Sequence, residues 1–268
     1  MADASTASSV KLTPKADKAG VKVTFKVFWK TTRFWKEEDI LDFQRAVPAI
    51  VERLRTEQYW DKEGSIKENK FTCEDFAIRV LCEYAAPKGL PVKLTTGVRT
   101  YWNMEVYNPK AHADYQSNVY GFSEMVMLSY GAPDMQRLGV NTEAVKDPES
   151  LKAGDILALA HDLKGSSTGG RAHHIQLVVA TSSKTVNIYQ GNSDSTIHRP
   201  ITWINRLIGR NGADPAQKAY AGLPIERGVY TETSKGVWDY LNTTTKNTSS
   251  DFLKSFDLLR WDFMGFNK

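Results

Sequence analysis

The sequence predicts an α+β domain in which N-terminal helices pack on an antiparallel β-sheet. In the first half of the chain, apolar residues recur at helical spacing within residues 40–54 and again within residues 76–84. In the second half the repeat changes to that of strands, in segments 151–159, 173–180 and 185–192. Short connections between these segments predict an antiparallel meander.

Composition and charge are those of an ordinary globular chain of 268 residues. Hydrophobic residues make up 41% and charged residues 25%, which is enough apolar material for a core without disulfide bonds. The net charge of +4, from 35 basic and 31 acidic residues, is too small a surplus to indicate binding to nucleic acid. The two cysteines, Cys73 and Cys82, lie on different turns of one predicted helix, a geometry that disfavours a disulfide bond between them.

Three features of the chain bear on its organisation. No run of about 18 apolar residues is present, so we expect no membrane span. The first residues lack a basic region followed by an apolar core, so we expect no secretory signal peptide. Pro48 falls within the first helical stripe and is expected to kink or divide that helix.

Cys73 is the first candidate for a chemical role. It precedes the apolar stripe of the second helix, so we place it in the first turn of that helix. Unpaired backbone N–H groups and the helix dipole favour a thiolate at such a position, which would make Cys73 a nucleophile. The alternative is that Cys73 is simply a small buried hydrophobe.

The strand pattern selects a base for this thiol among the histidines of the chain. These are His112, His161, His173, His174 and His198. In segment 173–180 the apolar residues at 175, 177 and 179 should pack inward, with His173 on the same buried line. His174 then lies on the opposite face, which we expect the cysteine helix to cover.

A third polar group is needed to orient the imidazole from its far nitrogen. Gln190 and Asn192, at the end of the next strand, point to one face because they are two residues apart. Asp194, slightly beyond the strand, is a third candidate. The alternative is that this segment is only a strand end that enters a turn.

Three blocks of this sequence, in the same order, resemble the NlpC/P60 cysteine peptidases. The blocks are Cys73-Glu74-Asp75-Phe76-Ala77 with the later Gly89-Leu90-Pro91, then Leu151-Lys152-Ala153-Gly154-Asp155-Ile156-Leu157, and then His174-Ile175-Gln176-Leu177-Val178-Val179. Two positions depart from the family pattern. Thr72 stands where the family often has Asp, and Gln190 stands where it commonly has His. Gln190-Gly191-Asn192 partly matches the Glu-x-Asn pair of the related CHAP amidases.

The resemblance implies a papain-like α+β fold and hydrolysis of amide bonds in the peptides of bacterial peptidoglycan. Cys73 would attack the carbonyl carbon, His174 would carry the proton, Gln190 or Asn192 would hold the imidazole ring, and the backbone N–H of Cys73 would help to bind the oxyanion. No cofactor or metal is expected, because the histidines and acids lack the clustered spacing of a zinc site.

The extent of the resemblance and the composition of the termini predict how the whole chain is organised. The resemblance covers residues 71–192, so residues 195–268 form a C-terminal extension without a catalytic signal of its own. We expect residues 1–20 to be flexible and residues 21–268 to form a single catalytic domain.

A peptidoglycan-directed fold without a signal peptide is similar to the toxins that type VI secretion systems inject into a rival's periplasm. It would also suit a phage lysin. A toxin of this kind would be made in the bacterial cytoplasm and exported, and a cognate immunity protein would block its groove.

Two other functions are compatible with the same residues. One is a transglutaminase-like deamidase or acyltransferase toxin that acts on a protein, since that chemistry also uses Cys, His and a third polar residue. The other is a non-catalytic module that binds carbohydrate or protein on an inert papain-like core.

Overall fold

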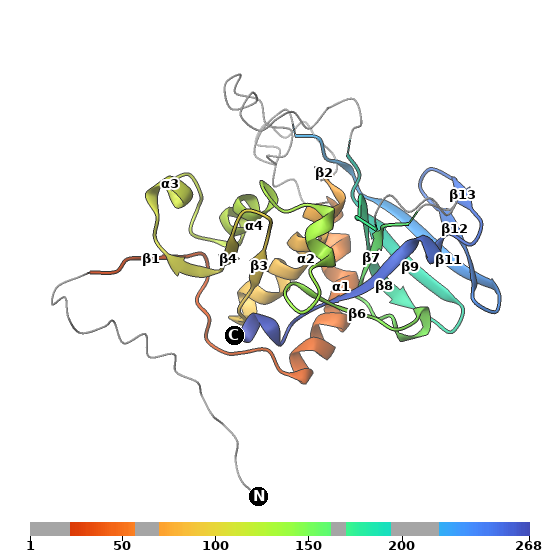
Figure 1. The fold of residues 1–268 in the computed structure, drawn as a ribbon, viewed down its shortest axis with the longest axis horizontal. Helices are drawn as coiled ribbons and strands as arrows, with labels where there is room; N and C mark the ends of the chain where they lie inside the picture. Colours follow the sequence, from red (N-terminus) through yellow and green to blue (C-terminus); the bar gives the residue numbers. More distant parts are fainter. Residues whose placement is uncertain (1–21, 57–69, 162–169, 194–219) are drawn as a thin grey trace, which may run out of the picture.

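Helices and an antiparallel sheet lie side by side in the part of the chain that the structure describes (Figure 1). The structure is a computed structural model, and it describes residues 22–56, 70–161, 170–193 and 220–268. The segment 1–20, Asp194 and His198 lie outside these residues. Among the described helices, none is both long and apolar enough to cross a bilayer.

The described residues contain four α-helices and four short 3-10 helices. The α-helices are α1 (Glu37–Thr56), α2 (Cys73–Lys88), α3 (Pro109–His112) and α4 (Val119–Met127). The 3-10 helices are η1 (Ala132–Gln136), η2 (Pro148–Ser150), η3 (Leu253–Ser255) and η4 (Gly265–Asn267).

Among the described residues, eight strands form the main sheet and six form three small two-stranded sheets. The main sheet contains β6 (Thr142–Ala144), β7 (Ile156–Leu159), β8 (His174–Thr181), β9 (Thr185–Gln190), β11 (Glu226–Ser234), β12 (Val237–Asn242), β13 (Thr248–Ser249) and β14 (Phe256–Trp261). The small sheets pair β1 (Phe25–Val27) with β5 (Met104–Val106), β2 (Lys70–Phe71) with β10 (Leu223–Pro224), and β3 (Lys93–Thr95) with β4 (Thr100–Trp102).

The main sheet has the order β13-β12-β11-β9-β8-β7-β14-β6, and every neighbouring pair is antiparallel. The predicted meander is confirmed, because β7, β8 and β9 are neighbours in chain order. Residues 220–268 extend the same sheet on both sides: β11 pairs with β9, and β14 returns to pair with β7. The prediction of the α+β class is likewise confirmed.

Helix α1 continues as one helix through Pro48, so of the two effects expected of this proline, a kink or a division, the division is wrong. The apolar stripe explains why. Phe43, Val47, Val51 and Leu54 are almost fully buried, while Pro48 is exposed on the other side. An interior proline costs a helix about 3 kcal/mol. Burial of each large apolar side chain returns about 1.5–3 kcal/mol, so four of them outweigh that cost.

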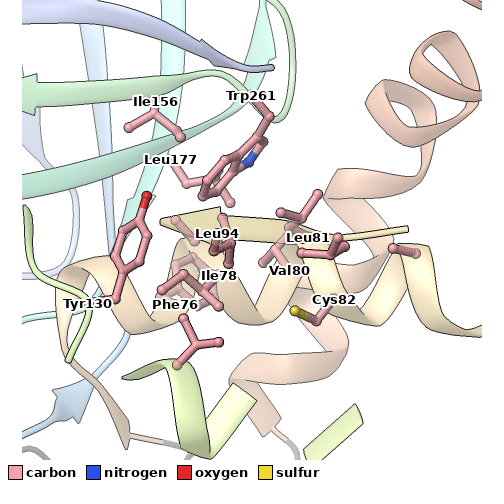
Figure 2. Packing of buried hydrophobic residues seen from close by; sticks show 14 of the residues in the cluster. Phe76, Ile78, Val80, Leu81, Cys82, Leu94, Tyr130, Ile156, Leu177 and Trp261 are labelled. Atoms are coloured by element: carbon pink, nitrogen blue, oxygen red, sulfur yellow. The ribbon is translucent and has the colours of Figure 1, made fainter. Parts of the chain in front are cut away.

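Helix α2 is buried on all sides. Twelve of its 16 residues are buried, and it packs against α1, α4 and strand β8. Figure 2 shows Phe76 and Leu81 of α2 gathered with Ile156, Leu177 and Trp261 of the sheet. A helix that is enclosed in this way has little freedom to shift. Its first residue, Cys73, is therefore held at a fixed place relative to the sheet.

The two faces of the sheet carry separate apolar clusters. Ile175, Leu177 and Val179 of β8 belong to the cluster that the helices cover, whereas Val178 belongs to the cluster on the opposite face. This second cluster contains Leu157, Ile188, Tyr230, Tyr240 and Phe256 from the neighbouring strands.

The expectation that the cysteine helix covers the face of His174 is therefore wrong, because α1 and α2 lie on the face of Ile175 and Leu177. The placement of His173 on a buried line is also wrong. His173 precedes the first residue of β8 and is exposed. The side chains of β8 alternate as predicted, but the helices cover the face of Ile175 and Leu177 rather than the face of His174.

The Gly154-Asp155 pair, one of the blocks that carry the family resemblance, has a structural role at the start of β7. Gly154 has a φ of +91°, and a Cβ at this position would lie 2.4 Å from the ring of Phe43. Asp155 is buried and accepts two hydrogen bonds from Arg260 of β14, from Nε to Oδ1 and from Nη2 to Oδ2, each 2.7 Å long. The backbone N–H of Lys152 donates to Oδ2 at 2.7 Å. Asp155 thus ties the turn before β7 to the last strand of the chain.

We predict that Asp155→Ala lowers the free energy of unfolding by about 1–3 kcal/mol, because Arg260 loses the carboxylate that it binds. Urea unfolding measures this change. Asp114→Ala, at an exposed position, is the matched control and should stay within about 0.5 kcal/mol of the wild type. An Asp155→Ala protein as stable as that control would contradict the proposed link.

Candidate active site

Cys73 is the first residue of α2, as predicted. Thr72 is the N-cap and has an extended backbone conformation. The preceding residues form strand β2, which pairs with β10, so the chain reaches the helix from a hydrogen-bonded strand. Cys73 is 7% exposed. The first backbone N–H groups of an α-helix have no hydrogen-bond acceptor within the helix, and they place partial positive charge beside the thiol.

Glu74 opposes this electrostatic effect. Its side chain is buried, and the Cys73 thiol donates a hydrogen bond to Glu74 Oε2 over a distance of 2.9 Å. An ionised carboxylate so close to sulfur favours the thiol over the thiolate. The Cys73 thiol is therefore a hydrogen-bond donor to Glu74 in this structure.

Tyr220 holds the turn that leads into the helix. Its hydroxyl oxygen accepts from the backbone N–H of Thr72 at 2.8 Å, and its O–H donates to Asp75 Oδ2 at 2.8 Å. Burial raises the pKa of Tyr220 well above its ordinary value, so this phenol stays protonated and remains a donor. Tyr220 lies in the part of the chain where we predicted no site residue.

His174 is the first residue of β8, and Gln190 is the last residue of the neighbouring strand β9. Because the two strands are antiparallel, these two ends meet at the same end of the sheet. His174 Nε2 lies 2.9 Å from Gln190 Oε1. Of the two orienting candidates in the described residues, Gln190 is the one whose side chain contacts His174.

Burial lowers the pKa of His174, because it disfavours the imidazolium form. The hydrogen bond to Gln190 and the negative charges of Glu74 and Glu226 act in the opposite direction but do not cancel the effect. His174 is consequently neutral at neutral pH and can accept a proton. The influence of Glu74 also indicates that the start of α2 lies near the imidazole.

Gly191 explains how the start of α2 comes so close to the end of β9. A Cβ on this residue would lie 2.3 Å from the carbonyl oxygen of Thr72 and 2.5 Å from that of Phe71. Both contacts are with backbone, which cannot swing away as a flexible side chain can. The backbone at the start of α2 therefore lies against the end of β9, next to Gln190, whose side chain contacts His174.

Asn192, the other orienting candidate in the described residues, has a different place. Its backbone carbonyl accepts from the N–H of Leu223 at 2.9 Å. Asn192 also lines a cavity of about 320 Å³ together with His174, Gln190, Glu226 and two residues of the loop between β12 and β13. It borders the site, whereas Gln190 contacts the histidine directly.

Cys82 is a core residue. It has no exposed surface, and burial raises the pKa of its thiol to about 12. Figure 2 shows it on α2 among the packed apolar side chains. Cys73 and Cys82 are not joined by a disulfide bond, as expected.

Two other histidines have structural partners of their own. His112 Nε2 lies 2.7 Å from Glu105, and His161 Nε2 lies 2.9 Å from Asp257. Within the described ranges, no group of three His, Cys, Asp or Glu side chains is placed to hold a metal ion.

Four polar residues that are linked to Gln190, directly or through one another, were not predicted from the sequence. They are Gln176, Glu226, Tyr230 and Asn242, and their hydrogen bonds form one connected set. Gln176 alone carried a usable signal, since a glutamine two residues after His174 lies on the same face of an otherwise apolar strand. Glu226 and Asn242 come from strands whose pairing with β9 could not be read from the sequence.

Comparisons of the chain with protein-family models, with curated proteins and with solved structures found no match to any of them.

We predict that Gly191→Ala lowers the free energy of unfolding by about 1–3 kcal/mol, because its Cβ would push the end of β9 away from the start of α2. Gly97→Ala is the control, since the nearest atom to a Cβ there is Arg137 Nη2 at 3.6 Å. Chemical denaturation of both variants measures the difference. Equal stability of the two variants would refute the close approach at Gly191.

Proposed function

We propose that this protein is a cysteine hydrolase that cleaves amide bonds in the peptides of bacterial peptidoglycan. The observation that carries the proposal is the hydrogen bond between His174 Nε2 and Gln190 Oε1, at the end of the sheet where α2 begins with Cys73. A histidine oriented through one ring nitrogen can use the other as a base. The family resemblance of the three sequence blocks supplies the substrate class.

The proposed reaction begins with transfer of the Cys73 proton to His174 Nδ1. The thiolate attacks the carbonyl carbon of the substrate amide, and the resulting oxyanion is stabilised by N–H donors at the start of α2. Collapse of this intermediate breaks the C–N bond. His174 returns its proton to the leaving amine, and a thioester to Cys73 remains.

Hydrolysis of the thioester completes the cycle. His174, neutral again, removes a proton from a water molecule that attacks the thioester carbon. The carboxylate product leaves, and the sulfur recovers its proton. The lowered pKa of His174 suits both steps, because the imidazole is unprotonated and ready to act as a base at neutral pH.

Fold and biological setting complete the proposal. A cysteine at the start of a buried helix, followed in the chain by an antiparallel sheet that carries the histidine, supports a papain-like fold of the NlpC/P60 type. The setting that we propose is injection of the enzyme into a rival's periplasm by a type VI secretion system, or else the role of a phage lysin. In the first case a cognate immunity protein would protect the producing cell.

Digestion of purified peptidoglycan tests the proposed activity. We predict that the wild type releases peptides with new amino and carboxyl termini, detected by mass spectrometry. Cys73→Ala should lower the rate at least about 10³-fold, because the covalent route is lost. Cys82→Ala is the matched control, the same substitution on the same helix, and should retain activity.

Two outcomes would reject the proposal. One is full activity of Cys73→Ala on peptidoglycan. The other is an intact peptidoglycan combined with a one-dalton mass increase on glutamine residues of an added protein, which would indicate the deamidase alternative.

A further inference from the structure

A connected set of polar side chains lies behind His174, on the face of the sheet away from the helices. Gln190 Nε2 donates to Glu226 Oε2 at 2.9 Å, and Asn242 Nδ2 donates to the same oxygen at 2.7 Å. Gln190 Oε1 accepts from Gln176 Nε2 at 2.8 Å, in addition to its contact with His174. The set links the imidazole to Glu226 through a single amide side chain.

We propose that Glu226 is a positioning residue: through Gln190, its carboxylate oxygen holds the proton of neutral His174 on Nε2 and leaves the lone pair on Nδ1. This inference rests on the proposed function for its catalytic meaning. It makes a statement about the imidazole, however, that can be tested without any substrate.

The direction of the hydrogen bonds follows from what each group can do. An ionised carboxylate only accepts hydrogen bonds, so the end of Gln190 that faces Glu226 must be its NH₂ group. The carbonyl oxygen of the same amide then faces His174. An oxygen can only accept from the ring, so Nε2 must carry the hydrogen.

The neighbours of Gln190 reinforce this direction. Tyr230 donates from its hydroxyl to Gln176 Oε1 at 2.8 Å, which turns the NH₂ group of Gln176 toward Gln190 Oε1. That oxygen therefore receives two donors. If the Gln190 amide turned end for end, its NH₂ group would face the NH₂ group of Gln176, which is a donor against a donor.

Glu226 is itself held at its far side. Asn242 Oδ1 accepts from the backbone N–H groups of Thr244 and Thr245, at 3.0 and 2.9 Å. Backbone amides only donate, so the NH₂ group of Asn242 must point to Glu226. Register supports the arrangement, since Glu226 of β11 lies directly opposite Gln190 of β9.

Burial makes these orientations matter. Gln176, Gln190 and Asn242 are 1%, 6% and 4% exposed, so water cannot easily replace a lost partner. Without an acceptor at position 226, the NH₂ group of Gln190 would be left unsatisfied. Of the groups that fix the amide, only Gln176 would then oppose its turn. A turned amide donates to Nε2, and the proton of His174 would move to Nδ1, the nitrogen that must act as the base.

Nitrogen-15 NMR of the full-length protein labelled at histidine tests the proposal directly. A ring nitrogen that carries a proton and one that does not have different chemical shifts, so the spectrum identifies the tautomer. His174 is assigned by its loss in His174→Gln, and spectra are recorded at about pH 7.5, above the ordinary histidine pKa of about 6.5. We expect the Nε2–H tautomer in the wild type. An Nδ1–H tautomer there would overturn the proposal regardless of any variant.

Three variants distinguish the effect of a hydrogen-bond acceptor at position 226 from the effect of its negative charge. Glu226→Leu removes the acceptor and should shift the ring resonances of His174 toward the Nδ1–H tautomer. Glu226→Gln can place its carbonyl oxygen where both donors converge, so it should retain the Nε2–H form. Glu232→Gln, on the same strand, is the control and should leave the spectrum of His174 unchanged.

The double variant Glu226→Leu with Gln190→Glu is the rescue. A carboxylate at position 190 accepts from the ring in either orientation, so it should restore the Nε2–H tautomer without residue 226. A wild-type spectrum in a folded Glu226→Leu protein would overturn the proposal. If Glu226→Leu does not fold, the tautomer of His174 in the wild type and in Glu226→Gln still tests the proposal, because both should be Nε2–H.

The NMR result does not depend on whether the protein hydrolyses peptidoglycan. An inactive wild type with the Nε2–H tautomer would reject the proposed function and leave the role of Glu226 intact. An active enzyme with the Nδ1–H tautomer would do the reverse. In an active enzyme, Glu226→Leu should lower kcat with little effect on KM, because the residue acts through His174 rather than on substrate.

Discussion

The close contact between Gly191 and the carbonyl oxygens of Phe71 and Thr72 is the constraint on which the candidate site depends. It brings the end of β9 against the start of α2, two parts of the chain that are far apart in sequence. Gln190 and Cys73 immediately adjoin this contact, one on each side. A Cβ does not fit at Gly191, so the close approach of the two backbones requires a glycine at this position.

Charge around His174 is balanced in a way that suits a base. Burial lowers the pKa of the imidazole, while the carboxylates of Glu74 and Glu226 oppose that change. The same Glu74 accepts a hydrogen bond from the Cys73 thiol. For the proposed reaction to begin, the thiol proton must move from sulfur to the neutral imidazole.

Local pattern predicted the elements, whereas long-range pairing decided the site. Helical and strand periodicity depend on residues that are close in sequence. This is why the sequence predicted the first turn of α2, the meander of β7 to β9 and the alternation along β8. The helix-covered face was predicted wrongly, since alternation separates two faces but does not say which one the helices cover. Glu226 and Tyr220 were not predicted, because contacts between segments that are far apart in the chain do not show in the local sequence pattern.

The central claim is that Cys73 and His174 act as a thiol and its base. The pH dependence of alkylation by iodoacetamide, with the modified peptide identified by mass, measures it most directly. We predict reaction at Cys73 and not at Cys82, with an acid limb below about pH 6.5, because the lowered pKa of His174 keeps the base form at lower pH. His174→Ala should move the profile to the ordinary thiol range near pH 8.5 or above. Identical profiles for the wild type and His174→Ala would contradict the account.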